Sequence, residues 1–214
     1  MTFDLGAHPL VARAVFDGQV TFSSRAGVVA SLAPVDDLMR RRMRKLTVDA
    51  TEQFGVDLDS LRSGQGRSQP LRVGEVQLGR HVDSLMCAAI DSGQPMTDVD
   101  AATTLLGLQA PKIRALVRHR ICRVNAASYV TVLSDLTRRS PRTMTAPVAG
   151  LLAFAAWLSG NGALAWVAID RTRQDDPAEP LAACVAEFLT GALAPRHYRD
   201  RSDPELYREF YPER

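Results

Sequence analysis

A chain of 214 residues is long enough to bury a continuous core, so it forms one domain or one domain with an appendage. Its hydrophobic fraction of 46% is that of an ordinary globular protein. A net charge of +2 excludes binding to phosphate through an overall basic field, so any nucleic-acid contact depends on local patches. The first ten residues, MTFDLGAHPL, lack the basic and apolar regions of a secretory signal, and we therefore expect a cytoplasmic protein.

Residues 1–60 predict a group of N-terminal helices. The serines before Arg25 are suitable N-caps for a helix that runs through Leu32. Pro34 ends this helix, because proline cannot continue one, and a longer helix is expected over Val35–Phe54.

The longer helix carries the densest basic run of the chain, which consists of Arg40, Arg41, Arg42, Arg44 and Lys45. These side chains spread over more than half of the helix circumference, so some of them face solvent in any fold. One interpretation is a solvated face whose cations pair with the nearby Asp36, Asp37 and Asp49. The other is a contact with nucleic acid or with an acidic partner. The sequence leaves both open.

Residues 61–70, LRSGQGRSQP, predict a polar loop, and residues 71–195 predict the main helical bundle. The first half of this bundle is expected to contain helices over Glu75–Ser92, Thr97–Leu108, Lys112–Cys122 and Ala126–Arg138. Thr97 begins a capping box, Pro111 suits the first position of a helix, and Asn125 is the expected N-cap of the next helix. Arginines between Arg114 and Arg142 offer a second basic surface.

The uncharged run from Pro147 to Ile169 contains both tryptophans, and the other segments are expected to pack around it. About 20 apolar residues suffice to cross a bilayer, so the run has the length of a membrane span. Its middle, SGNG, indicates a turn instead, with Gly160 as a helix stop and Asn161 as the N-cap of a second helix. The run therefore predicts a hairpin of helices over 147–158 and 162–173, without a membrane span, and a third helix follows over 178–189.

The segment from Leu151 to Leu189, LLAFAAWLSGNGALAWVAIDRTRQDDPAEPLAACVAEFL, resembles the C-terminal signature of an actinobacterial family, the domain of unknown function 4192. In that signature the pattern LLAFxAW…GxGALAxVALDRALxxDPxYxLAxLL recurs. The match is carried by Leu151, Leu152, Ala153, Trp157, Gly160, Gly162, Ala163, Leu164, Ala165, Ala168, Asp170, Arg171, Asp176, Pro177, Leu181 and Ala182. A weaker similarity covers Ser23–Pro34, so that the resemblance extends over about two-thirds of the chain. It implies that the N-terminal α/β region of longer members is absent here, and it supplies no activity.

The same segment resembles half of a tetratricopeptide repeat (TPR), with Gly160 and Ala165 at the positions of its inter-helix glycine and small packing residue. No second copy follows at a period of about 34 residues, so we expect only a TPR-like hairpin and no array of repeats.

The chain contains none of the common catalytic or nucleotide-binding patterns, such as HExxH, GxSxG, GxxxxGK[ST] or GxGxxG. Its three cysteines, Cys87, Cys122 and Cys184, have no CxxC spacing and are expected to be reduced core residues. We therefore expect no catalytic residue, no cofactor and no metal site.

Residues 196–214 form a tail that is rich in arginine and aromatic residues. Its aromatic members are Tyr198, Tyr207, Phe210 and Tyr211. Their apolar area favours a clasp that docks on the domain; the alternative is a segment that becomes ordered on a partner, in which case these four side chains are the partner contacts.

Together these features predict an all-α protein, a compact bundle of seven to nine helices with the TPR-like hairpin at its core. Residues 1–195 are the helical domain and residues 196–214 the tail. The function expected is a non-catalytic protein-interaction domain, with a protein partner or a homo-oligomer and without a membrane. The alternative is a nucleic-acid-binding or regulatory protein that uses its arginine patches.

Overall fold

The computed structural model describes residues 25–63, 70–199 and 203–212, and these ranges contain eleven α-helices, two short 3-10 helices and no strand. The α-helices are α2 (Arg25–Ser31), α3 (Asp37–Phe54), α4 (Leu58–Ser63), α5 (Val73–Ser92), α6 (Asp98–Gly107), α7 (Pro111–Arg120), α8 (Ala126–Arg139), α9 (Thr145–Leu158), α10 (Gly162–Arg173), α11 (Pro180–Thr190) and α12 (Pro204–Phe210). The 3-10 helices are η2 (Arg142–Met144) and η3 (Pro195–His197). The expected all-α fold is confirmed.

The number of helices exceeds the expected seven to nine, and α4 shows why. Its six residues span less than two turns, so no apolar period is visible in the sequence. Asp57 caps this helix by accepting a hydrogen bond from the Ser60 backbone N–H at 2.8 Å. The expected loop over 61–70 is therefore helical at Leu61–Ser63, and residues 64–69 lie outside the described residues.

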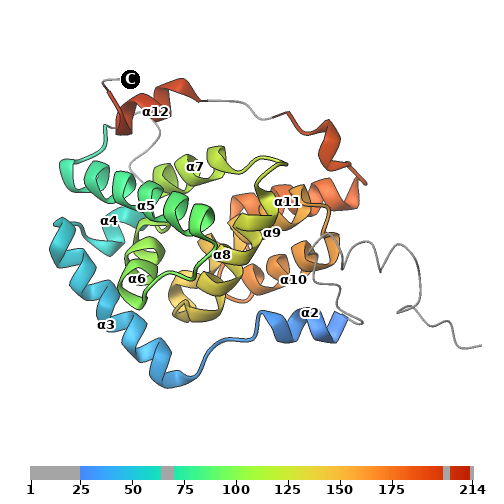
Figure 1. The fold of residues 1–214 in the computed structure, drawn as a ribbon, viewed down its shortest axis with the longest axis horizontal. Coiled ribbons are helices and arrows are strands. Elements are labelled where there is room, and N and C mark those ends of the chain that lie inside the picture. The colour runs from blue at the N-terminus through green and yellow to red at the C-terminus, as the bar shows by residue number, and fades with distance from the viewer. Residues whose placement is uncertain (1–24, 64–69, 200–202, 213–214) are drawn as a thin grey trace, which may run out of the picture.

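Helix α9 is the centre of the fold, and every one of its 14 residues is buried. Figure 1 shows α9 inside the molecule, and its neighbours α8, α10 and α11 contact it along its length. The alanines of α9 allow these helices to approach closely. This helix shows no amphipathic pattern because it is covered on all sides.

The predicted hairpin of α9 and α10 is confirmed. Gly160 adopts φ +84° between the two helices, a left-handed conformation that glycine adopts without strain. Asn161 then caps α10, since its Oδ1 accepts a hydrogen bond from the Leu164 N–H at 3.0 Å. The likeness of this hairpin to a TPR unit stays a prediction. No helix in the described ranges combines the length and apolar character of a membrane span.

Helix α11 approaches α9 at one close contact between Gly150 and Glu179. A Cβ atom at Gly150 would lie 2.5 Å from Glu179 Oε2, so the position admits only glycine unless the carboxylate moves. Glu179 is 3% exposed and caps α11 by accepting a hydrogen bond from the Ala182 N–H at 2.7 Å. Burial raises the pKa of Glu179.

Two predictions about single residues need correction. Asn125 does not cap α8 through its side chain, which accepts a hydrogen bond from the Cys122 N–H at 2.8 Å and donates to the Arg120 carbonyl at 2.9 Å. It therefore holds the turn between α7 and α8. Cys122 is exposed in this turn and is not a core residue, whereas Cys87 and Cys184 are half-buried.

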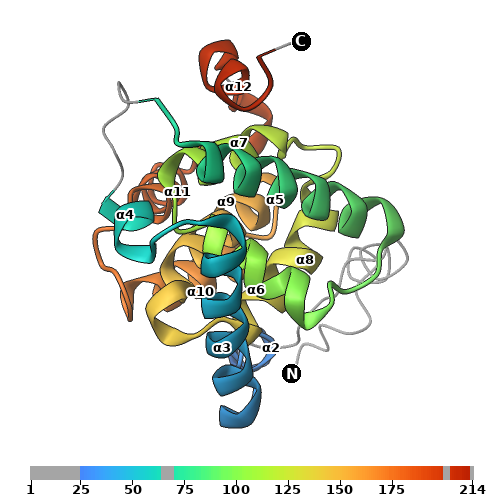
Figure 2. The ribbon, with the colours of Figure 1, turned by 90° about the vertical axis from the view of Figure 1, so that its left-hand side faces the viewer.

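The remaining helices surround this centre. Helix α3 packs against α6, and Figure 1 shows it at the left-hand edge of the molecule. Figure 2, seen from that side, shows α3 in front, and its Met43 is fully buried. Thr97 caps α6 as predicted, since its Oγ1 accepts a hydrogen bond from the Asp100 N–H at 3.2 Å. One continuous apolar cluster extends from Val28 to Phe210, so the N-terminal helices and α12 share the core of the main bundle.

Candidate functional site

The basic run lies on α3, and the structure divides its five cations into two groups. Arg40 is half-buried: its Nε donates to the Val35 carbonyl at 3.1 Å, and its Nη1 lies 3.8 Å from Asp37. Arg42 is exposed, but its Nε lies 3.0 Å from the carboxylate of Asp98 on α6. Arg40 therefore bonds within the N-terminal end of α3, whereas Arg42 joins α3 to α6.

Arg41, Arg44 and Lys45 form the second group. All three are exposed, and none makes an ion pair with any residue that the structure describes. Of the carboxylates expected to neutralise the run, Asp36 instead caps α3 by accepting a hydrogen bond from the Met39 N–H at 2.7 Å. The pairing expected for a solvated face is thus found only for Arg40.

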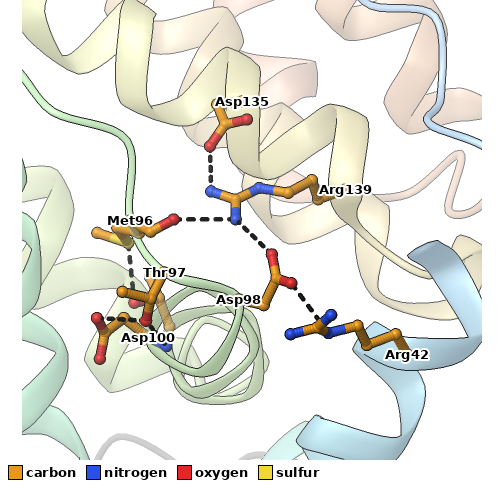
Figure 3. Close-up of polar contacts among 8 residues, drawn as sticks. Arg42, Met96, Thr97, Asp98, Asp100, Asp135 and Arg139 are labelled. Atoms are coloured by element: carbon orange, nitrogen blue, oxygen red, sulfur yellow. Dashed lines mark hydrogen bonds and ion pairs between the residues drawn. The ribbon is translucent and has the colours of Figure 1, made fainter.

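Arg42 belongs to a chain of four charged side chains that crosses three helices (Figure 3). Asp98, in the first turn of α6, binds Arg42 through Oδ2 and accepts a hydrogen bond from Arg139 Nη1 through Oδ1 at 3.3 Å. Arg139, on α8, also donates to the Met96 carbonyl at 3.1 Å and pairs with Asp135. The side chain of Arg139 is 8% exposed, and its Nε has no hydrogen-bond partner within the described ranges. This chain fixes the orientation of α3 relative to α6 and α8.

Two large apolar side chains of α3 are exposed to solvent. Leu38 is 78% exposed and Val48 is 57% exposed. With Arg41 and Lys45 between them they follow a spacing of three, four and three residues, which places all four on one face of a helix. We call Leu38, Arg41, Arg44, Lys45 and Val48 the α3 outer face.

The α3 outer face stores electrostatic repulsion within its own helix. Its members Arg41 and Lys45 are a pair of like charge four residues apart, and Arg44 lies four residues after Arg40, a cation outside this face. Each such pair destabilises a helix by about 0.2–0.5 kcal/mol. A carboxylate placed against this face would relieve the repulsion.

A cavity of about 280 Å³ lies beside this charged chain, between the C-terminal end of α5 and α8. It is lined mainly by apolar groups such as Ile90, Met96 and Val132, and Asp135 is its one ionisable residue. Asp135 pairs with Arg139, and the Ser128 and Thr131 hydroxyls line the same cavity. Within the described ranges, no three His, Cys, Asp or Glu side chains lie close enough to bind a metal ion.

The aromatic side chains of the tail dock on the domain. Tyr198 packs its ring against Phe154, Trp157 and Phe188, with ring centroids 5.4, 5.6 and 6.2 Å away. Its hydroxyl accepts a hydrogen bond from Arg118 Nη1 at 2.9 Å. The segment at Tyr198 is therefore part of the aromatic core around α9.

The other three aromatic residues belong to α12 and its C-terminal end. Phe210 is fully buried against α5, and Tyr211 donates its hydroxyl hydrogen to Asp83 Oδ2 at 2.7 Å. Burial raises the pKa of Tyr211, which keeps the phenol protonated as a donor. Tyr207 stacks on Tyr211 with ring centroids 4.8 Å apart. The four aromatic residues therefore contact the chain itself, as in the favoured clasp, and not as in the alternative of a segment ordered by a partner.

Sequence reasoning missed the residues that receive α12. Asp83 is 5% exposed on its side chain and accepts two hydrogen bonds from Arg120, at 3.0 and 2.6 Å. Gly79 lies four residues before Asp83, on the same face of α5. The sequence signal for this site was a glycine and an aspartate on a helix face that is otherwise apolar.

The second basic surface expected between Arg114 and Arg142 does not form as a continuous patch. Arg118 bonds to Tyr198, Arg120 bonds to Asp83, and Arg139 is buried among carboxylates. These side chains look exposed in a helical pattern because their partners are remote in sequence. Arg123, Arg138 and Arg142 remain exposed, but they are divided between the turn before α8, the end of α8 and η2. On the α3 outer face, three exposed cations lie within one helix.

Comparison with known proteins supports a family assignment and no activity. No curated protein and no solved structure matches this chain. The family described as "Domain of unknown function (DUF4192)" matches residues 2–196, which is wider than the two-thirds expected from the sequence signature. That an α/β region of longer members is missing here stays a prediction. The match ends before α12 and covers most of the chain, and this protein therefore belongs to the DUF4192 family.

Proposed function

We propose that this protein is a non-catalytic, cytoplasmic protein-interaction domain, and that the α3 outer face binds an acidic segment of a partner protein. The observation that carries the proposal is the combination of three exposed cations that make no ion pair within the described ranges and two exposed apolar side chains on one helix face. Exposed apolar groups beside charges of one sign are typical of a surface that a partner covers.

Charge complementarity defines the partner. Arg41, Arg44 and Lys45 would pair with Asp or Glu side chains, while Leu38 and Val48 would contact apolar residues between those carboxylates. An amphipathic helix with acidic residues beside its apolar face has this pattern. Partner helices of this kind contact a protein through side chains spaced three and four residues apart. The ion pair between Arg42 and Asp98 would keep α3 in place on α6 while the partner binds.

Nucleic acid is the second candidate, and the same face fits it less well. Neutralising Z phosphates gives a salt slope of about −0.9Z on duplex DNA, so three free cations allow a slope of only about −3. Leu38 and Val48 would then face a polyanion without burying their apolar area. A protein partner uses all five members of the α3 outer face.

Site-specific photocrosslinking tests the proposal. A photoreactive residue at Val48 is activated in nuclease-treated lysate of the native host, and the matched control carries it at Val124, which is 96% exposed away from α3. We expect a protein adduct at Val48 that is absent at Val124, with the crosslink mapping to a segment rich in Asp and Glu. Adducts of equal yield at both positions, or a crosslink to a basic or uncharged segment, would refute the proposal.

Two further outcomes of this experiment also count against it. A crosslink between two copies of this chain would replace the acidic partner by a homo-oligomer. In a parallel sample without nuclease, retention of nucleic acid at low salt that is lost on charge reversal of Arg41 and Lys45 would favour the second candidate.

A further inference from the structure

Helix α12 packs on a surface that α5 and α7 form together. Figures 1 and 2 both show α12 lying against α5 and α7, at a distance from α3. The family match ends at residue 196, so the surface belongs to the family domain and its occupant lies beyond it.

The apolar part of the site is a slot above Gly79. A Cβ atom at Gly79 would lie 2.2 Å from Phe210 Cε1 and 2.7 Å from Phe210 Cδ1, so the ring occupies the space of a side chain. The three atoms nearest to that Cβ position all belong to the Phe210 ring. The glycine in the interior of α5 thus provides room for an aromatic side chain of another segment.

The polar part of the site is built around Asp83. This buried carboxylate accepts two hydrogen bonds from Arg120 and a third from the Tyr211 hydroxyl at 2.7 Å. Arg120 lies 5.6 Å from the centroid of the Tyr207 ring, and Arg80 lies 5.6 Å from that of Tyr211. Both distances are within the range of cation–π contacts.

Two further contacts set the direction and the charge of the occupant. Arg80 donates its Nε hydrogen to the Phe210 carbonyl, and the Lys112 ammonium pairs with the Glu209 carboxylate. The surface therefore contacts four of the five positions from Tyr207 to Tyr211, and the exposed Arg208 is the fifth.

Helix α12 depends on this surface for its structure. It has seven residues, and isolated helices shorter than about 12 residues are marginal in water. Within the helix only Leu206 and Phe210 are buried, so it is held by few side chains. A segment of this kind opens at a lower free energy than the core helices.

We propose that the α5–α7 surface is a binding site for a short helix with the pattern Tyr-x-Glu-Phe-Tyr, and that α12 fills it as a detachable intramolecular ligand. A partner protein segment with this pattern binds by displacing α12. The tether gives α12 an effective concentration that reaches the millimolar range, so an external segment competes at a disadvantage until α12 is weakened. This inference does not depend on the α3 outer face.

Peptide binding to the full chain tests the proposal. The probe is a fluorescein-labelled peptide with the sequence of residues 203–212, DPELYREFYP, and binding is followed by fluorescence anisotropy. We expect the Phe210→Ala chain to bind the probe at least tenfold more tightly than the wild type, because its own α12 is weakened. Adding Gly79→Leu to Phe210→Ala should abolish binding, and a probe with alanine in place of its phenylalanine should not bind.

A folded Phe210→Ala chain that binds the probe no more tightly than the wild type would overturn the proposal. Amide hydrogen exchange on the wild type provides a second measurement that needs no variant. We expect the amides of α12 to exchange faster than those of α9, and protection equal to that of α9 would make α12 a permanent part of the core. A dimer of the wild type that the probe dissociates would show that α12 binds between copies, which also contradicts an intramolecular ligand.

Discussion

Replacing Arg139 with methionine removes the guanidinium that joins α8 to α6, and we expect the free energy of unfolding to fall by about 3 kcal/mol. Removing one partner of a buried ion pair costs about 3–5 kcal/mol, because the remaining charge stays without compensation. The lower end applies here, since Arg42 remains bonded to Asp98 and the side chain of Asp135 is 34% exposed. For a chain of this size the loss corresponds to a decrease in Tm of roughly 6–12 °C.

Urea denaturation followed by circular dichroism at 222 nm measures this loss. Arg138→Met is the matched control, because the neighbouring Arg138 is exposed and its side chain makes no ion pair within the described ranges. We expect its effect to stay within about 0.5 kcal/mol of zero. A loss below about 1 kcal/mol for Arg139→Met, or equal losses for the two variants, would refute the assignment of Arg139 as the link between these helices.

Three further predictions concern the core and the cysteines. Gly150→Ala should lower the free energy of unfolding by about 1–3 kcal/mol although alanine favours helix, because its Cβ displaces the Glu179 carboxylate; thermal denaturation measures the change. Because burial raises the pKa of Glu179, the folded state binds this proton more readily than the unfolded state. Relative to Glu179→Gln, the wild type should therefore lose stability as pH rises from about 4 to 7, and parallel stability curves for the two proteins would contradict this. Thiol labelling of the native protein should modify Cys122 first, since Cys87 and Cys184 are half-buried and burial raises the pKa of both thiols; three equal rates would disagree.

Local signals in the sequence were sufficient for the central hairpin. The bounds of α10, Gly162–Arg173, agree with those predicted, because Gly160 and Asn161 act on the adjacent backbone. Helix α9 begins at Thr145, two residues before the predicted start, because η2 leads directly into it. Both helices are long enough for their composition to identify them.

Long-range pairing is what the sequence did not reveal. The apolar pattern of α3 did not show which side is buried, since Met43 is buried whereas Leu38 and Val48 are exposed. Nor did it show the partner of Arg42, which is Asp98, in another helix. Likewise, the sequence pattern predicted that Arg120 belongs to an exposed basic surface, whereas in the structure Arg120 pairs with the buried Asp83. The docking of α12 depends on Gly79, whose function is visible only when Phe210 lies against it. Charged side chains with remote partners follow the same local pattern as solvated ones.

The affinity of the crosslinked partner for charge-reversed α3 tests the central claim most directly. The Arg41→Glu, Lys45→Glu double variant is compared with an Arg123→Glu control, which reverses an exposed cation away from α3. We predict at least a tenfold loss of affinity for the double variant, measured by isothermal titration calorimetry, and less than a twofold change for the control. Equal affinity of the double variant and the wild type would contradict the α3 outer face as the binding site.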